Sequence, residues 1–238
     1  MKTVSRTHAA ALVLSLAAAG ACALPRTGVQ AQSTPAAFVN FLNAAPGAPA
    51  GAIFVDGAVR VKSLAFAHPS RYLPLPAGTH RVQAFPAGTP YTSTGGVINV
   101  LVALQPGRYY TLVGAGTPAH FQGLLVTSPA HGVPGKAQVG FVDLVQDAPP
   151  VDIAVHGVGM VFANISFGQP ARKPIAIPAG AYTAVVSPAG QDSVKMATVP
   201  LHVAAGQSYT VYALGRLHGA GGAPHLRTVI TSYTPARP

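Results

Sequence analysis

The chain has 238 residues, of which only 8 % are charged and 49 % are hydrophobic, with 26 glycines and 23 prolines. Fifteen Lys and Arg residues stand against five aspartates and no glutamate, which gives a formal charge of +10. This composition excludes a charge-rich helical bundle and favours short strands joined by frequent turns. The basic residues are scattered, with Arg172-Lys173 as an adjacent pair, so the charge does not predict nucleic-acid binding.

The N-terminal residues 1–31 have the pattern of an export signal, with a positive start and an apolar core over residues 9–19. The core is too short for a membrane span. Cleavage after Val29-Gln30-Ala31 fits ordinary signal peptidase, whereas Ala19-Gly20-Ala21-Cys22 resembles a lipoprotein box without its leading leucine. Free secretion and a lipid anchor on Cys22 therefore stay as alternatives. Cys22 is the only cysteine, so the mature protein has no internal disulfide.

The first half of the mature chain predicts a series of short strands. Asp56-Gly57 between two apolar runs is a strong hairpin signal, and turn residues recur at the spacing of an all-β sandwich. In Pro76-Ala77-Gly78 we expect a tight turn between two strands. The predicted strands span residues 38–43, 52–55, 59–61, 71–75, 80–85, 97–104, 109–114 and 124–127.

The second half repeats these landmarks about 100 residues later. His156-Gly157 corresponds to Asp56-Gly57, and Pro178-Ala179-Gly180 corresponds to the first Pro-Ala-Gly. A period of this size indicates a duplicated domain rather than a solenoid. We predict a signal peptide (1–31), a first repeat (36–128), a short proline-bearing linker of limited hinge freedom (129–136) and a second repeat (137–234). The predicted fold is two tandem antiparallel β-sandwich domains, immunoglobulin- or transthyretin-like.

Five short motifs occur in the same order in both halves: an early Ala-Pro, an apolar strand into a turn glycine, Leu/Ile-x-Phe, Pro-Ala-Gly and a late Gly-x-x-Tyr-Thr. In this order they resemble the bacterial family labelled domain of unknown function 4397, over nearly all of the chain after the leader. The family's aspartate before the second strand is kept as Asp152 but replaced by Ala52, while Asp56 is replaced by His156. The resemblance implies an exported or envelope-attached β-sandwich module and carries no established activity.

One segment is dense in potential metal ligands, but its residues spread over two strands and a Pro-Pro turn, unlike a calcium loop. We favour a structural interpretation, in which Asp147 and Asp152 accept backbone N–H bonds in the turn. His218 and His225 flank a glycine-rich loop, and we expect both to be solvated. We therefore predict no metal and no cofactor. The dense set is Asp143, Asp147, Asp152 and His156.

Tyrosines recur near the late Gly-x-x-Tyr-Thr motif of both repeats. Such residues can be corner tyrosines that bond the backbone, or they can form a carbohydrate platform; without any tryptophan we favour core or corner duty. The residues are Tyr109, Tyr110, Tyr209 and Tyr212.

The sequence lacks the Gly-x-Ser-x-Gly elbow of serine hydrolases, and its five aspartates make a pair of catalytic carboxylates improbable. We predict no catalytic residues and a non-catalytic binding or structural module, located in the cell envelope or outside the cell. Its expected partner is an unknown envelope protein or polysaccharide, with no nucleic acid and with membrane contact only through a lipid anchor on Cys22. The alternatives are a carbohydrate or cell-wall binding module and, third, an unrecognised enzyme.

Overall fold

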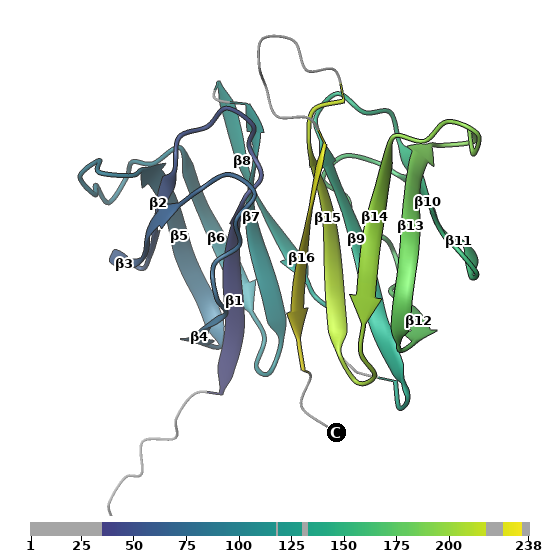
Figure 1. Ribbon diagram of the computed structural model, residues 1–238. Helices are drawn as coiled ribbons and strands as arrows, with labels where there is room; N and C mark the ends of the chain where they lie inside the picture. The colour runs from purple at the N-terminus through teal and green to yellow at the C-terminus, as the bar shows by residue number, and fades with distance from the viewer. Residues whose placement is uncertain (1–34, 118, 130–132, 218–225, 235–238) are drawn as a thin grey trace, which may run out of the picture. The chain divides into compact units, whose positions relative to one another are not determined.

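A computed structural model describes residues 35–117, 119–129, 133–217 and 226–234. The leader with Cys22, and the histidines His218 and His225, lie outside these ranges. The described residues form sixteen strands and no helix (Figure 1). Accordingly, none of them belongs to an apolar helix long enough to cross a membrane.

Each half of the chain builds its own pair of four-stranded sheets, so the prediction of two tandem β-sandwiches is confirmed. In the first sandwich the sheets have the orders β4-β1-β7-β8 and β3-β2-β5-β6. In the second they have the orders β12-β9-β15-β16 and β11-β10-β13-β14. The first eight strands are β1 (Ala36–Asn43), β2 (Gly51–Val55), β3 (Ala58–Leu64), β4 (Leu73–Pro76), β5 (Gly78–Pro86), β6 (Ile98–Leu104), β7 (Tyr109–Thr117) and β8 (His120–Thr127). The next eight are β9 (Lys136–Val145), β10 (Val151–Val155), β11 (Gly159–Ile165), β12 (Ile175–Pro178), β13 (Gly180–Pro188), β14 (Ala197–Val203), β15 (Ser208–Gly215) and β16 (Arg227–Tyr233).

One sheet of each sandwich is mixed, which corrects the expectation of purely antiparallel sheets. Strand β1 pairs in parallel with β7, and β9 pairs in parallel with β15, while the other pairs are antiparallel. Parallel neighbours need a long crossover connection, and here the other sheet of the sandwich supplies it. Sequence patterns alone do not reveal which strands become neighbours after such a crossover.

The two turn motifs behave differently. Asp56 (φ 51°) and Gly57 (φ 81°) form the predicted tight hairpin between β2 and β3, where both central residues need positive φ. The Pro-Ala-Gly turn does not form a hairpin, because β4 and β5 lie in opposite sheets with only Ala77 between them. The motif therefore marks the point at which the chain crosses from one sheet to the other.

Alternation along the strands fills a core inside each sandwich. In the first, the largest fully buried side chain is that of Phe41, surrounded by residues such as Val55, Val82 and Leu112. Phe141, Val155 and Val211 take the places of Phe41, Val55 and Leu112 in the second. Inward and outward residues alternate as the pleat of a strand requires.

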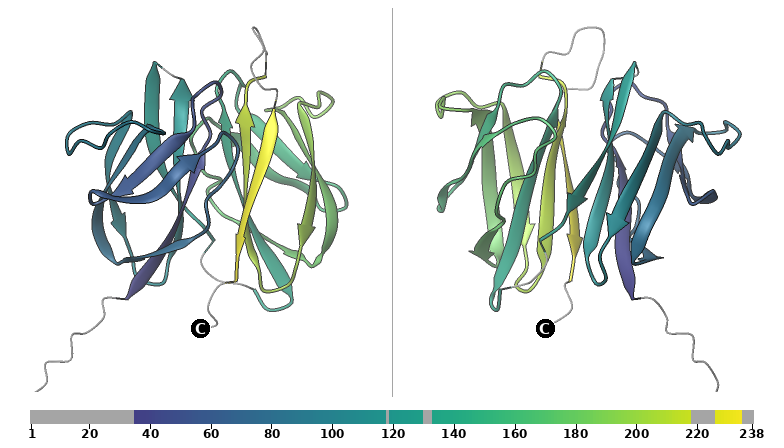
Figure 2. Two further views of the ribbon diagram at one scale, coloured as in Figure 1. Left: turned by 60° about the vertical axis from the view of Figure 1, so that its left-hand side comes forward. Right: turned by 180° about the vertical axis from the view of Figure 1, so that it is seen from behind.

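A third apolar cluster lies between the two sandwiches, which belong to one compact unit. It joins the sheets that contain β1 and β9, which we call the inner sheets (Figures 1 and 2). Strands β1, β7, β9 and β15 are therefore covered on both faces, which explains continuously buried runs such as residues 141–145, where Asp143 is buried among four apolar residues. The members are Leu42, Ala44, Val113, Ala115 and Val126 from the first repeat, and Val142, Leu144, Tyr212, Leu214 and Val229 from the second.

Equivalent positions of the two repeats meet in this cluster. Strand registers equate Leu42 with Val142 and Val113 with Tyr212, and all four residues are buried there. The same surface of both repeats is used, as in the self-complementary interface of a two-fold dimer. Across this interface the Gln146 side chain donates to the Gly116 carbonyl oxygen.

The equivalence breaks where the linker begins. Tyr109 and Tyr233 stack with ring centroids 3.8 Å apart, but the equivalent residues of the opposite repeats are Ser208 and Ser128. On that side Pro129 lies over Gly140, with Pro129 Cγ 3.5 Å from the position that a β-carbon would take. The small residues Ser128, Ser208 and Gly140 therefore make space for the chain at Pro129, where it leaves the first repeat.

Candidate functional site

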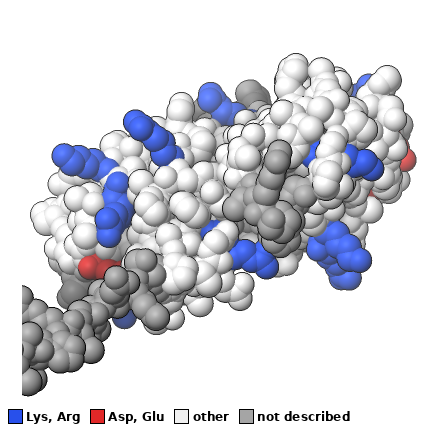
Figure 3. All heavy atoms as spheres, turned by 90° about the horizontal axis from the view of Figure 1, so that it is seen from below, with Lys and Arg blue, Asp and Glu red and all other residues white. Residues whose placement is uncertain are grey.

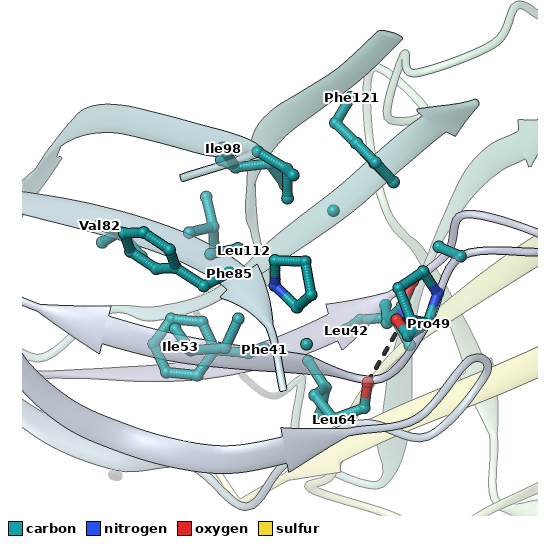
Figure 4. A pocket seen from close by; sticks show the side chains of 17 residues that line it. Phe41, Leu42, Pro49, Ile53, Leu64, Val82, Phe85, Ile98, Leu112 and Phe121 are labelled. Atoms are coloured by element: carbon teal, nitrogen blue, oxygen red, sulfur yellow. Dashed lines mark hydrogen bonds between the residues drawn. The ribbon is translucent and has the colours of Figure 1, made fainter. Parts of the chain in front are cut away.

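An apolar cavity lies between the sheets of the first sandwich, near the end of β1 and the start of β2 (Figure 4). Its volume is about 70 Å³. The side chains around it come from both sheets, so the cavity belongs to the sandwich interior rather than to a surface loop. Six of them are Phe41, Ile53, Leu64, Phe85, Ile98 and Leu112.

The cavity has a local cause in the sequence, because small residues occupy inward positions that are larger in the second repeat. Strand pairing equates Gly51 with Val151 and Ala84 with Val186. Each replacement removes methyl groups from the wall, and a well-packed interior does not fully collapse around such losses. The wall of the first cavity therefore lacks the methyl groups that Val151 and Val186 carry in the second repeat.

The polar side chain in the wall, Asn43, is already used by the backbone. Its Oδ1 accepts from the Ala45 N–H at 3.2 Å, and its Nδ2 donates to the carbonyl oxygens of Pro49 (3.4 Å) and Leu64 (3.3 Å). The residues that line the cavity include no charged side chain. This site can therefore enclose an uncharged group but offers no acid, base or nucleophile.

The rim of the cavity is also apolar. Val97 is 43 % exposed although it is hydrophobic, and Pro49 beside it is exposed. Phe121 on β8 is half-buried and lines the same cavity (Figure 4). The Val97 N–H donates to the Ala84 carbonyl oxygen at 2.8 Å, so this part of the rim keeps no free donor.

The second sandwich has a cavity of about 70 Å³ at the equivalent place, but with a carboxyl in its wall. Asp143 stands where the first repeat has Asn43 and is 0 % exposed. Its Oδ1 accepts from the Val145 N–H at 3.0 Å, while its Oδ2 has no hydrogen-bond partner. Burial raises the pKa of Asp143 to about 6, against the lowering effect of that hydrogen bond.

The structure separates the four ligand-type residues that the sequence places close together. Asp152 accepts from the N–H groups of Asn164 on β11 (2.7 Å) and of Gly190 in the turn after β13 (2.8 Å), and Asp147 accepts from the Leu217 N–H at 2.6 Å. The interpretation that these two aspartates accept backbone N–H bonds is confirmed, but the expectation that the bonds stay within the turn is wrong, because the partners lie 12, 38 and 70 residues away in the sequence. Within the described ranges no three metal-ligating side chains come together.

A histidine–aspartate pair that the sequence analysis missed fixes the crossover after β4. His80 Nδ1 lies 2.6 Å from Asp56 Oδ2, and His80 Nε2 lies 2.8 Å from the Pro76 carbonyl oxygen. Burial of the ring opposes its protonation, but the hydrogen bonds to Asp56 and Pro76 outweigh this effect and raise the pKa of His80. In the second repeat Tyr182 takes this role, donating its hydroxyl to the Pro178 carbonyl oxygen at 3.1 Å. The pair therefore has a structural role. The feature of the sequence that could have revealed it is the alignment of His80 with Tyr182 in the two repeats.

The tyrosines have the predicted corner and core duties. The Gln105 N–H donates to Tyr110 Oη at 3.1 Å, and the Ala204 N–H donates to Tyr209 Oη at 3.0 Å. Both bonds span five residues, so each repeat has its own tyrosine corner.

Other tyrosines lie between the inner sheets. The fully buried Tyr212 hydroxyl lies beside those of Thr111, Thr210 and Thr231, but none of these oxygen atoms has the geometry of a formed hydrogen bond. Burial raises the pKa of Tyr233, which stacks on Tyr109, to about 12. These residues serve the interface between the repeats.

Basic side chains do not gather in one stripe on the face shown in Figure 3, where Lys and Arg are spread over the surface. Among the described residues the ion pair is that of His80 and Asp56. Most lysines and arginines of the described ranges are exposed, whereas Arg108 and Arg216 are half-buried.

Comparisons with known proteins add a family but no activity. A family model described as "Domain of unknown function (DUF4397)" matches residues 37–154 and 137–232. No curated protein matches the chain. A solved structure, the Bacillus anthracis TIE protein, is similar at 9 % identity and a TM-score of 0.26, over 84 % of this chain and 43 % of that protein. The chain thus spans less than half the length of that protein.

Proposed function

Because the chain belongs to the DUF4397 family of unknown function, we propose a function from its geometry: it is an exported, non-catalytic module of the cell envelope or extracellular space that binds through the first sandwich. The observation that carries this proposal is the apolar cavity near Asn43, which has a wall without charge. Such a wall favours enclosure of a ligand group over its chemical conversion.

The placement of the acidic residues supports a non-catalytic role. Asp147 and Asp152 are held by backbone N–H groups, Asp56 is held by His80, and Asp143 is buried. Catalysis by paired carboxylates needs two acids that face one substrate. Export is supported by the signal-like pattern of residues 1–31, and Cys22 after its apolar core keeps a lipid anchor as the alternative to free secretion.

The cavity favours a binding role over a purely structural one. A protein that only spaces other components gains nothing from a void, and filling a void of this kind normally increases stability. The second repeat carries the larger residues Val151 and Val186 at the equivalent positions, where they line a cavity of about 70 Å³ with a carboxyl in its wall, so the fold tolerates valine at both positions. We infer that the small residues of the first repeat serve a ligand.

The test has two arms on the purified mature protein. Ester, amide, glycoside and phosphoester substrates should give no turnover above buffer. The protein should co-sediment with the envelope fraction of its own producer, and the Ala84→Val variant should do so less. Turnover that disappears when a described aspartate or histidine is replaced would refute the non-catalytic proposal. Equal co-sedimentation of both proteins would refute binding through the cavity.

A further inference from the structure

The structure assigns a ligand class to the first cavity: we propose that it holds the uncharged end of an alkyl chain, about three carbon atoms long. This inference rests on the proposed binding function and names its ligand. Three features carry it: the volume of the cavity, the chemistry of its wall and rim, and its contrast with the second cavity.

The volume limits the size of the occupant. A cavity of ~150 Å³ lined by aliphatic and aromatic side chains encloses a benzene ring and stays dry when empty. The first cavity has about half this volume, about 70 Å³. It therefore holds about half as many carbon atoms, and a ring of six carbons is too large without movement of the wall.

The wall and the rim exclude a polar or charged occupant. Asn43 is the polar side chain of the wall, and its amide is used by Ala45, Pro49 and Leu64. A hydroxyl or charged group that entered would lose its bonds to water without replacement, at a cost of several kcal/mol. The end of an alkyl chain has no hydrogen bonds to water to lose, and the transfer of its apolar surface from water into the cavity is favourable.

The rim also distinguishes an alkyl chain from a peptide side chain. A leucine or valine of a partner would bring its backbone amides to the mouth, where Pro49 has no N–H and the Val97 N–H is occupied. The exposed Val97 and the half-buried Phe121, which both line the cavity, instead offer apolar contact to the next methylenes of an alkyl chain. The occupant is therefore an alkyl chain rather than a protein side chain.

The second cavity is a control within the same molecule. Its volume is also about 70 Å³, but its wall contains the buried Asp143 carboxyl and Arg227. If size alone decided binding, an alkyl probe would enter both cavities. The proposal requires that the probe enters the first one only.

The experiment uses the methyl groups of the mature protein as reporters in NMR titrations. 1-Butanol, which can insert three carbons while its hydroxyl stays at the mouth, should shift the methyl signals of Ile53, Ile98 and Leu112. Xenon should shift the same signals. Glycerol, which has three hydroxylated carbons, should shift none of them, and the Val151 and Val186 signals should stay unchanged throughout.

Two variants locate the site. Ala84→Val copies the side chain of the second repeat, and Gly51→Val places a side chain where the nearest atom to a β-carbon is Phe85 O at 3.7 Å. Both should weaken 1-butanol binding at least about tenfold while the protein remains folded by thermal unfolding. The matched control Val186→Ala changes the second sandwich and should leave the affinity of the first unchanged.

Several results would overturn the ligand class. They are unchanged methyl signals with 1-butanol and xenon, equal shifts in both cavities, or tighter binding of N-acetyl-leucine amide than of 1-butanol. Unweakened binding to both filled variants would overturn the location. None of these results produces turnover, so they are distinguishable from failure of the non-catalytic proposal.

Discussion

Replacing Asp143 by asparagine should stabilise the protein at neutral pH, although most substitutions of fully buried residues destabilise. The carboxyl is 0 % exposed, and its Oδ2 has no hydrogen-bond partner. In the first repeat, the equivalent Asn43 donates from its amide to the carbonyl oxygens of Pro49 and Leu64. An ionised aspartate cannot donate such bonds, whereas a protonated aspartate or an asparagine can.

The magnitude follows from the pKa of Asp143, which burial raises from 3.8 to about 6. Below pH 3.8 both folded and unfolded chains carry the proton, so burial of this group costs nothing extra. Between these values the folded state binds more protons, and the free energy of unfolding falls as the pH rises. Above about pH 6 the full penalty applies, on the order of 3 kcal/mol at 1.36 kcal/mol per pKa unit.

Urea unfolding of the natural protein and Asp143→Asn at pH values from 4 to 8 measures this difference. The variant should be about equal in stability at pH 4 and about 3 kcal/mol more stable at pH 8. The control Asp192→Asn changes an exposed carboxyl and should leave the natural pH profile unchanged. A variant that is less stable at pH 8, or whose advantage is the same at every pH, would refute the reasoning.

Three further predictions test other parts of the structure. Because Asp56 raises the pKa of His80, Asp56→Asn should lower that pKa in an NMR titration, and an unchanged His80 titration would contradict the pairing. The stabilisation by the pair should be complete below pH 6.5 as long as Asp56 stays ionised, and it should be lost as the pH rises through the folded pKa of His80. Ala84→Val should raise the free energy of unfolding by up to about 1.7 kcal/mol, because ~24 cal/mol is regained for each Å³ of a cavity of about 70 Å³ that is filled. A lower free energy of unfolding in urea would contradict this and indicate that valine is too large for the wall. Tyr110→Phe and Tyr209→Phe should each cost about 1 kcal/mol in urea unfolding, because each leaves a backbone N–H without its acceptor, and a neutral result would contradict the corner role.

Local signals in the sequence were sufficient for the strands and the duplication. Asp56-Gly57 predicted its hairpin because only a tight turn uses that pair between apolar runs. The corner role of the tyrosines and the backbone role of Asp152 also followed from residue type and position. These features depend on short-range geometry that the residues themselves impose.

Long-range pairing was the part that the sequence could not supply. The run at residues 38–43 is buried or half-buried on both faces, Asn40 included, because a second inner sheet covers it, but the pattern of a single strand does not identify that cover. The Pro-Ala-Gly turn at Ala77 separates two sheets, a choice made by tertiary packing and not by turn chemistry.

The candidate site left a signal that was visible only by comparing the repeats. Gly51 against Val151, Ala84 against Val186 and Asn43 against Asp143 differ in volume or charge at equivalent positions. These differences indicate a cavity only when it is known which side chains meet between the two sheets. The sequence alone does not show which side chains meet.

The central claim of the account is that the two repeats form one unit through a shared apolar layer. The natural chain contains no tryptophan, so a single tryptophan at Tyr91 or at Tyr182 would report on the first or the second sandwich alone. Guanidinium unfolding of the two variants should give coincident, single transitions, because loss of one sandwich would expose the inner face of the other. Two separated transitions, one for each tryptophan, would contradict the claim.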